Sequence, residues 1–330
     1  MQTQFQIGGL ALESPVFLAP MAGYTDMPFR LIVRSFGGVG LAFTEMLNPA
    51  SVLRGREKKV KFLLATCSDD QPLGYQIYGK EPGPLADAAR FLADRGAPLI
   101  DVNMGCPQKK ISGRGAGAGL LRKPELAVEI ARRVVEAVRI PVTVKIRLGW
   151  DNAQTAIDLA KEFEKLGVAA MTVHGRTRVQ KFEGKSDWEA IGRVRAAVDR
   201  IPIIANGDVM SVESAREVLR ITGCAGIMLG RQPIKEPWLL RDIARDLCGL
   251  PPLPPPNWEE HTALMLKHFG LCAELYGEKR TVVQFRKWVP QYLKGKFVPR
   301  PVLASLQQIK DAAELRKRLL DVMLGPAAAR

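Results

Sequence analysis

The chain has 330 residues, of which 47% are hydrophobic and 25% charged, a composition typical of a globular protein with a large core. It carries 48 Lys and Arg against 34 Asp and Glu, a net charge of +14, which favours an anionic partner, with nucleic acid ahead of a membrane surface. No apolar run reaches membrane-spanning length, and the N-terminus lacks the pattern of a signal peptide. We therefore expect a cytoplasmic protein without a membrane contact.

The cysteines are odd in number and widely spaced, at Cys67, Cys106, Cys224, Cys248 and Cys272. No two of them form a Cys-x-x-Cys pair, and the chain has only three histidines. Neither a disulfide framework nor a metal site is therefore expected.

Short apolar runs alternate with helical patterns up to about residue 249. Eight runs are predicted strands: Val16–Pro20, Gly40–Glu45, Leu73–Tyr78, Leu99–Asn103, Val142–Arg147, Ala170–His174, Ile203–Asn206 and Gly226–Gly230. The predicted helices between them include Pro82–Arg95, Pro124–Val138, Ala153–Leu166, Trp188–Val198 and Val212–Ile221. This alternation predicts a parallel sheet. Eight strands without Gly-x-Gly-x-x-Gly after the first favour a closed (β/α)8 TIM barrel over a doubly wound dinucleotide fold.

A proline-rich stretch at residues 250–256 predicts a stiff, extended linker, because proline cannot continue a helix or a central strand. It separates a barrel domain at 1–249 from a small all-helical domain at 257–330. The helices expected there are Trp258–Tyr276, Thr281–Leu293 and Pro301–Leu324. The tail holds 13 basic and 7 acidic residues, a net +6, which suggests a module that holds an anionic substrate. A merely solvated helix surface is the alternative.

One segment combines a thiol with a basic stretch. The apolar run that ends at Asn103 predicts a buried parallel strand, and Gly105 and Pro107 force a turn, so that Cys106 lies beyond the carboxyl end of the strand. Lys109, Lys110 and Arg114 follow among glycines, which predicts a cationic, mobile loop. The segment by itself fits chemistry on an anionic polymer and a buried structural cysteine equally well.

Polar residues stand at the carboxyl ends of most predicted strands, where (β/α)8 barrels bind their ligands. Lys145 lies within Val142-Thr143-Val144-Lys145-Ile146, an otherwise buried run, so its charge needs a partner. The last two strands end in Asn206-Gly207-Asp208 and Gly230-Arg231. Glycine turns beside an arginine at these two strands favour a phosphate site over ordinary tight turns.

Several segments, in order, resemble the tRNA-dihydrouridine synthases, bacterial flavoenzymes that reduce uridine in RNA. They include Ala19-Pro20-Met21-Ala22-Gly23-Tyr24-Thr25-Asp26, Asp101-Val102-Asn103-Met104-Gly105-Cys106-Pro107, Val144-Lys145-Ile146-Arg147-Leu148-Gly149-Trp150, Val173-His174-Gly175-Arg176-Thr177-Arg178 and Tyr276-Gly277-Glu278-Lys279-Arg280. The resemblance runs from about Pro15 to Lys296. It implies an FMN-binding TIM barrel, NADPH as the reductant, tRNA as the substrate and a helical C-terminal domain that helps to grip it.

The resemblance also implies roles for single residues. The flavin contacts map onto Pro20, Met21, Ala22, Gln76, Lys145, Asn206, Gly207, Asp208, Gly230 and Arg231. His174 falls near the flavin or the substrate, Asn103 would orient the uracil, and Cys106 occupies the proton-donor position. A thiol with an ordinary pKa of ~8.5 is mostly protonated at neutral pH and can give C5 of uracil its proton. The candidate phosphate contacts are Lys109, Lys110, Arg176, Arg178, Arg286 and Lys287.

The chain departs from the family pattern at Gln232-Pro233-Ile234-Lys235, at Trp288 after Arg286-Lys287, and at Gly117-Ala118-Gly119. None of these departures removes a flavin contact, but they leave the target uridine open. We expect a monomer that holds no metal. Three alternatives stay open: the same reduction on ribosomal RNA, a flavin barrel for small pyrimidines resembling dihydroorotate dehydrogenases, and a non-catalytic RNA-binding protein.

Overall fold

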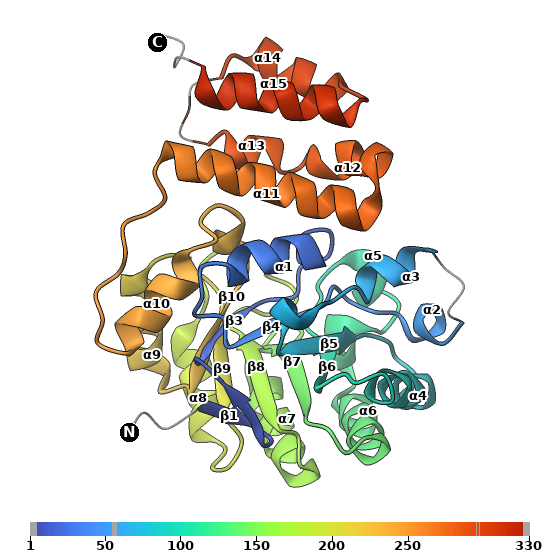
Figure 1. Ribbon diagram of the computed structural model, residues 1–330. Coiled ribbons are helices and arrows are strands. Elements are labelled where there is room, and N and C mark those ends of the chain that lie inside the picture. Colours follow the sequence, from blue (N-terminus) through green and yellow to red (C-terminus); the bar gives the residue numbers. More distant parts are fainter. Residues whose placement is uncertain (1–4, 55–57, 295, 297, 326–330) are drawn as a thin grey trace.

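The computed structural model describes residues 5–54, 58–294, 296 and 298–325. Eight parallel strands close a barrel in the order β10-β3-β4-β5-β6-β7-β8-β9 (Figure 1). Their bounds are β3 Val16–Leu18, β4 Leu41–Phe43, β5 Leu73–Ile77, β6 Leu99–Met104, β7 Val142–Arg147, β8 Ala170–His174, β9 Ile203–Asn206 and β10 Gly226–Leu229. Each overlaps one of the eight predicted strands, and the predicted TIM barrel is confirmed.

Helices surround the barrel, and the five predicted for this region are confirmed to within a few residues. The α-helices are α1 Met27–Arg34, α2 Pro49–Arg54, α3 Lys58–Leu63, α4 Pro82–Ala93, α5 Lys109–Ser112, α6 Pro124–Ala137, α7 Gln154–Leu166, α8 Trp188–Ala196, α9 Val212–Thr222 and α10 Leu239–Leu247. Three short 3-10 helices are η1 Ser68–Asp70, η2 Gly117–Arg122 and η3 Gln232–Ile234. Ser211 caps α9, as its position at the start of the pattern predicts.

The segment after Cys106 differs from the expected loop, because α5 and η2 occupy it. Ile111 is buried, and the Ser112 hydroxyl donates to the carbonyl oxygen of Pro107 at 3.2 Å. These inward contacts fold the stretch into a helix and leave Lys109 and Lys110 exposed on its outer side.

A hairpin that the sequence reasoning missed closes the bottom of the barrel. Strands β1 (Phe5–Ile7) and β2 (Leu10–Leu12) pair antiparallel around Gly8 and Gly9, both with positive φ. Ile7 and Leu12 share a buried apolar cluster with residues of the barrel interior. Two glycines between short alternating apolar runs are a hairpin signal that was available in the sequence.

The barrel interior changes character from bottom to top. Its lower part is apolar, with Phe17, Phe43, Leu99 and Met228 in one cluster. Gly74 makes room there, since a Cβ at this position would lie 2.6 Å from the Phe43 ring. Side chains two residues further along the same strands point into the same interior, and the upper part is polar, as described below. The hairpin therefore seals the dry end of the barrel, and the polar end faces the helical tail.

After α10 the chain runs through an exposed segment without helix or strand to the tail helices. These are α11 Trp258–Tyr276, α12 Glu278–Phe285, α13 Val289–Tyr292, α14 Arg300–Gln308 and α15 Ala312–Leu324. The first predicted tail helix is confirmed. The other two predicted helices are each divided in two: Pro290 stands in the first turn of α13, and Ile309 is extended before Asp311 caps α15. Among the described residues, no helix is long and apolar enough to cross a membrane.

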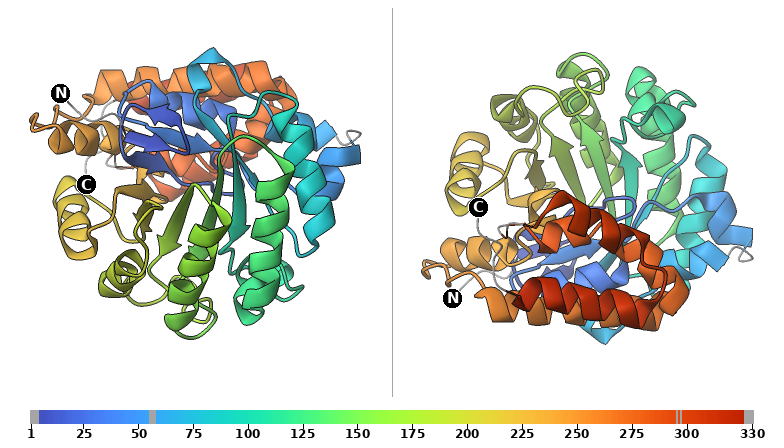
Figure 2. Two further views of the ribbon diagram at one scale, coloured as in Figure 1. Left: turned by 90° about the horizontal axis from the view of Figure 1, so that it is seen from below. Right: turned by 90° about the horizontal axis from the view of Figure 1, so that it is seen from above.

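The tail helices pack on α1, which follows the carboxyl end of β3, and so lie over the polar end of the barrel (Figures 1 and 2). Trp288 stacks on Phe29 of α1 at 4.7 Å between ring centroids, and Tyr24 meets it edge-on at 5.5 Å. The Tyr276 hydroxyl donates to Asp26 Oδ2 at 2.8 Å. One continuous apolar cluster includes both regions, so the division into domains at 249 and 257 stays a prediction.

We expect Trp288→Ala to lower the free energy of unfolding by about 3–5 kcal/mol, because it removes a fully buried aromatic side chain from this contact. Urea unfolding followed by far-UV circular dichroism measures the change. Val283→Ala on α12, where the side chain is 57% exposed, is the control and should change the free energy by less than about 0.5 kcal/mol. Equal effects of the two substitutions would contradict the proposed anchoring role.

Candidate functional site at the barrel mouth

Neighbouring strands bring polar side chains together at the carboxyl end of the barrel. Gln76 of β5, Asp101 of β6 and Thr143 of β7 lie side by side in the strand register. Asn103 and Lys145 pair two residues higher. This upper interior is therefore a layered polar site above the apolar base.

A directional chain of hydrogen bonds joins three of these strands. Thr143 Oγ1 donates to Asp101 Oδ1 at 2.6 Å, and Gln76 Nε2 donates to Asp101 Oδ2 at 2.6 Å. Asn103 Nδ2 then donates to Gln76 Oε1 at 2.8 Å. A carboxylate only accepts, so Asp101 fixes which way the Gln76 amide faces, and Gln76 in turn fixes Asn103. The amide oxygen of Asn103 is left facing the turn that follows β6.

That turn carries Cys106, and it is held from two sides. Asn103 Oδ1 accepts from the backbone N–H groups of Gly105 at 3.1 Å and Cys106 at 3.0 Å. Arg147 Nε donates to the Gly105 carbonyl oxygen at 2.9 Å. Burial raises the pKa of the Cys106 thiol, although the Gln108 backbone N–H and the charge of Arg147 oppose this. The thiol is half-buried, and its raised pKa keeps it protonated at neutral pH.

Burial also shapes the charges beside the thiol. Desolvation raises the pKa of Asp101 to about 6. Desolvation and the charge of Arg147 lower the pKa of Lys145 to about 8, and Lys145 Nζ donates to Asn206 Oδ1 at 2.7 Å. Burial and four surrounding cations lower the pKa of His174 well below its usual value. At neutral pH the mouth thus holds a lysine cation and a neutral histidine.

The ends of β9 and β10 form a second part of the site. Gly207 and Asp208 both have positive φ, and a Cβ on Gly207 would collide with the side chains of Ser186 and His174. In the described ranges, no protein acceptor takes the backbone N–H of Gly207, Asp208, Gly230 or Arg231, and the buried Ser186 hydroxyl has no partner. These donors, beside the exposed Arg231 guanidinium, suit an anionic group.

Comparison with known proteins identifies the family. The model of the family described as Dihydrouridine synthase (Dus) matches residues 17–325. The chain belongs to this family. It is 39% identical to a probable tRNA-dihydrouridine synthase of Rhodobacter capsulatus over 93% of this chain and 94% of the relative. It is 39% identical to tRNA-dihydrouridine synthase B of Xanthomonas axonopodis over 94% and 91%, and 38% identical to that of Pseudomonas aeruginosa over 93% and 92%.

A solved structure supports the fold independently. A 2-naphthoyl-CoA reductase in complex with 2-naphthoyl-CoA superposes with a TM-score of 0.59 over 76% of this chain and 52% of the reductase chain. The sequence identity is 12%, so this likeness concerns the barrel fold alone.

The structure brings most of the predicted site residues of this dihydrouridine synthase family member to one end of the barrel. The residues at the mouth or in the connections above it are Pro20, Met21, Ala22, Gln76, Asn103, Cys106, Lys145, His174, Asn206, Gly207, Asp208, Gly230 and Arg231. At Gly230, a Cβ would lie 3.9 Å from the Met21 sulfur, so the loops after the first and last barrel strands meet there. Which of these residues touch a flavin or a uracil stays a prediction.

Arg176 corrects the sequence analysis. It was predicted to contact phosphate, but it is only 2% exposed. Its guanidinium donates to Asp208 Oδ1 at 2.9 Å and Oδ2 at 2.7 Å and to the carbonyl oxygens of Glu183 and Gly184. Burial raises the pKa of Asp208, but the hydrogen bonds from Arg176 and the Ser186 N–H outweigh it and lower that pKa. The Arg176 guanidinium is thus engaged inside the protein, where it holds the loop after β8, and this burial argues against the predicted phosphate contact.

The other predicted phosphate contacts lie on α5, in the loop after β8 and in the tail, and they differ in exposure. Lys109 and Lys110 are exposed on α5. Arg178 is half-buried and donates to Ser112 Oγ at 3.2 Å. In the tail, Arg286 donates to the Ile309 carbonyl oxygen at 3.4 Å, and Lys287 Nζ donates to the Gly23 carbonyl oxygen. Contacts of these five with phosphate stay predictions.

Two positioning residues were absent from the predicted set. Asp101 orients the amides below the thiol, and Arg147 ties Gly105 to the loop after β8 by donating to the carbonyl oxygens of Thr177 and Lys181. The available signal was their spacing: both are charged residues two positions from a predicted site residue in a buried strand.

Asp101→Asn should change the pH dependence of stability. The folded chain holds the Asp101 proton more tightly than the unfolded chain, so the stability contributed by Asp101 is greatest below pH 3.8 and declines as pH rises to about 6. The free energy of unfolding of the variant, relative to the wild type, should therefore increase by about 2–3 kcal/mol across this interval. Urea unfolding at several pH values tests this. A difference in unfolding free energy between the variant and the wild type that stays constant with pH would contradict the raised pKa of Asp101.

Proposed function

We propose that this chain is a tRNA-dihydrouridine synthase that reduces the C5=C6 bond of uridines in tRNA, with FMN as the bound cofactor and NADPH as the reductant. The observation that carries the proposal is the position of Cys106, on a hydrogen-bonded turn at a polar barrel mouth, in a chain whose family is dihydrouridine synthase. The curated relatives named above are tRNA-dihydrouridine synthases, which favours tRNA over ribosomal RNA.

The residues at the mouth fit FMN. Lys145 would offer a cation to the edge of the ring system and stabilise negative charge there. Gln76, whose amide already bonds Asp101 and Asn103, would offer its remaining amide hydrogen. The unengaged N–H groups of Gly207, Asp208, Gly230 and Arg231 fit its phosphate. Pro20, Met21 and Ala22 would line the ring from the loop after β3. When bound and reduced by NADPH, FMN supplies two electrons and one hydrogen to C6 of uracil.

The protein supplies the other hydrogen. As negative charge develops on the C4 oxygen and C5 of the uracil, Cys106 Sγ gives its proton to C5, and solvent then restores the proton on sulfur. Burial of the thiol keeps that proton in place at neutral pH. The Asn103 bonds to the Gly105 and Cys106 N–H groups fix the turn that presents the sulfur. Asn103 retains one amide hydrogen for the uracil. His174, at the end of β8, stays neutral among the cations of the mouth.

The target base has to leave its stack to reach the thiol, as in other enzymes that act on bases. The basic residues around the mouth and the basic tail are the proposed contacts for the tRNA backbone. A cytoplasmic, monomeric protein remains our expectation.

Mass-spectrometric mapping of dihydrouridine in tRNA and ribosomal RNA tests the function in cells with and without this protein. We expect loss of dihydrouridine from one or more tRNA positions and recovery when the wild-type chain is returned. Unchanged tRNA together with loss from ribosomal RNA would move the substrate to ribosomal RNA and overturn the proposal.

Cys106→Ala should bind FMN normally, judged by visible absorption, but reduce uridine about 10²–10⁴ times more slowly, because it removes the general acid. Single-turnover reduction of tRNA by the FMN-loaded protein gives the rate. Cys248→Ser is the control, since Cys248 is exposed at the end of α10, and its rate should match the wild type. A fully active Cys106→Ala variant would rule out the proton-donor role.

A further inference from the structure

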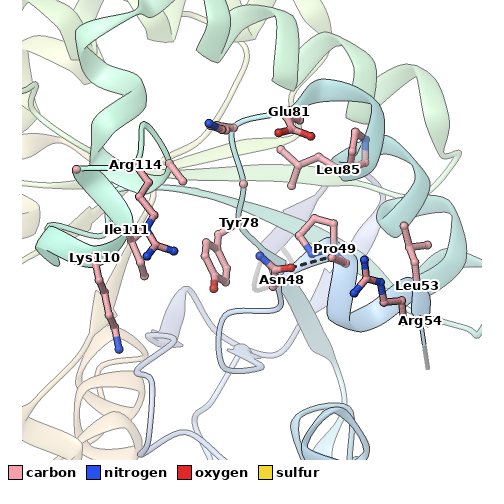
Figure 3. A pocket seen from close by; sticks show the side chains of 16 residues that line it. Asn48, Pro49, Leu53, Arg54, Tyr78, Glu81, Leu85, Lys110, Ile111 and Arg114 are labelled. Carbon is pink, nitrogen blue, oxygen red and sulfur yellow. Dashed lines mark hydrogen bonds between the residues drawn. The ribbon is translucent and has the colours of Figure 1, made fainter. Parts of the chain in front are cut away.

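A groove of about 1090 Å³ lies beside the mouth, between α2, the connection from β5 to α4, and α5. Figure 3 shows Tyr78 between the two walls, with Arg54 and Leu53 on one side and Lys110 and Arg114 on the other. The mechanism proposed above uses none of α2 or this connection, so the groove calls for a separate explanation.

The groove is cationic. Arg54, Lys80, Lys110 and Arg114 line it and are all exposed, against the single acidic residue Glu81. Within the described part of the chain, none of these four cations forms a hydrogen bond or an ion pair. Unpaired cations on facing walls attract an extended polyanion.

Between the cations the groove offers surfaces suited to bases. Tyr78 is half-buried, and its backbone N–H donates to the Leu47 carbonyl oxygen at 3.0 Å, which fixes its place. Leu53 is 39% exposed nearby. An aromatic ring flanked by basic side chains is the usual arrangement for unpaired nucleotides, because each base can stack whatever its sequence.

The wall formed by α5 continues into η2, which packs directly on the thiol turn. The Ala118 N–H donates to the Cys106 carbonyl oxygen at 3.1 Å. A Cβ at Gly117 would lie 3.1 Å from both Cys106 Cβ and Ile111 Cγ2, and Ile111 lines the groove. The wall of the groove is therefore packed against the turn that carries the proposed proton donor.

A dinucleotide fits the groove less well. A helix N-terminus with free N–H groups is the usual site for a pyrophosphate. Among the described residues, α4 is the only helix of at least eight residues that begins at the groove. There Glu81 is the capping residue and Pro82 follows it, so a carboxylate stands where the phosphates would bind. The basic side chains spread along the groove instead match the regularly spaced phosphates of single-stranded RNA.

We propose that this groove binds the unpaired RNA segment adjoining the uridine that is reduced, with Tyr78 stacking on a base and Arg54, Lys80, Lys110 and Arg114 contacting phosphates. The inference rests on the proposed function and adds to it a surface that grips the substrate next to the reacting base. It assigns a substrate-binding role to α2 and the β5–α4 connection.

A triple variant, Arg54→Ser/Lys80→Ser/Arg114→Ser, tests the charges and spares Lys110, whose charge acts on Cys106. Binding of tRNA is measured by fluorescence anisotropy at several salt concentrations. We expect about tenfold or more weaker binding at low salt and a slope of log Kd against log salt that falls by about 2, near 0.7 for each lost contact. FMN content and NADPH oxidation without RNA should stay unchanged.

The matched control is Arg133→Ser/Arg139→Ser/Lys161→Ser, which removes the same charge at exposed positions that do not line the groove. It should bind tRNA within about twofold of the wild type. Equal weakening by both triple variants would overturn the proposal, as would a groove variant that loses affinity for NADPH but not for tRNA. A wild-type chain that neither binds nor reduces tRNA would instead defeat the proposed function itself.

Substitutions of Tyr78 test the contribution of base stacking separately from that of charge. Tyr78→Ala should raise the KM for tRNA about tenfold, from the loss of one stacked base, whereas Tyr78→Phe and Tyr78→Trp should retain near wild-type values. FMN absorption and the melting temperature show whether the alanine variant stays folded. If a folded Tyr78→Ala variant kept the wild-type KM, the ring would have no role in RNA binding and the proposal would be wrong.

Discussion

The buried carboxylate of Asp101 is the constraint on which the rest of the site depends. It can only accept hydrogen bonds, so the amides of Gln76 and Asn103 must face as they do. The amide oxygen of Asn103, at the end of this chain of hydrogen bonds, holds the Cys106 turn. A buried charge is costly without such partners, so the orientation of the thiol turn follows from a carboxylate far below the surface. Strand register places these side chains side by side, and their hydrogen bonds set the orientation.

The same burial gives the site its electrostatic character. The apolar base, sealed by the β1–β2 hairpin, keeps water from the lower end of the barrel. Desolvation then raises the pKa of the Cys106 thiol and lowers that of Lys145. Lys145 stands two residues beyond Thr143, the β7 residue that pairs with Asp101. The same environment thus keeps the proton on Cys106 and leaves Lys145 a cation at neutral pH. These are the two properties that protonation of an electron-rich ring carbon needs.

The alternation of short apolar runs with helical patterns predicted the barrel and its strand ends. It also predicted the gathering of Gln76, Asn103, Lys145 and Asn206, because the carboxyl ends of parallel strands share one edge. The sequence did not predict features that depend on contacts between residues distant in the chain. Arg176 has the charge of a phosphate ligand, but Asp208, distant in sequence, engages it. The groove around Tyr78 assembles three segments that no local pattern connects. The break before α15 depends on an extended Ile309 inside an otherwise helical pattern.

The central claim is that Cys106 is a protonated thiol at neutral pH and acts as an acid. The most direct test is the rate at which iodoacetamide modifies Cys106 as a function of pH, after the exposed Cys67 and Cys248 have been replaced by serine. Only the thiolate reacts, so the account predicts a titration midpoint above the ordinary thiol value of about 8.5. A midpoint below about 7 would show a thiolate at neutral pH and would contradict the account.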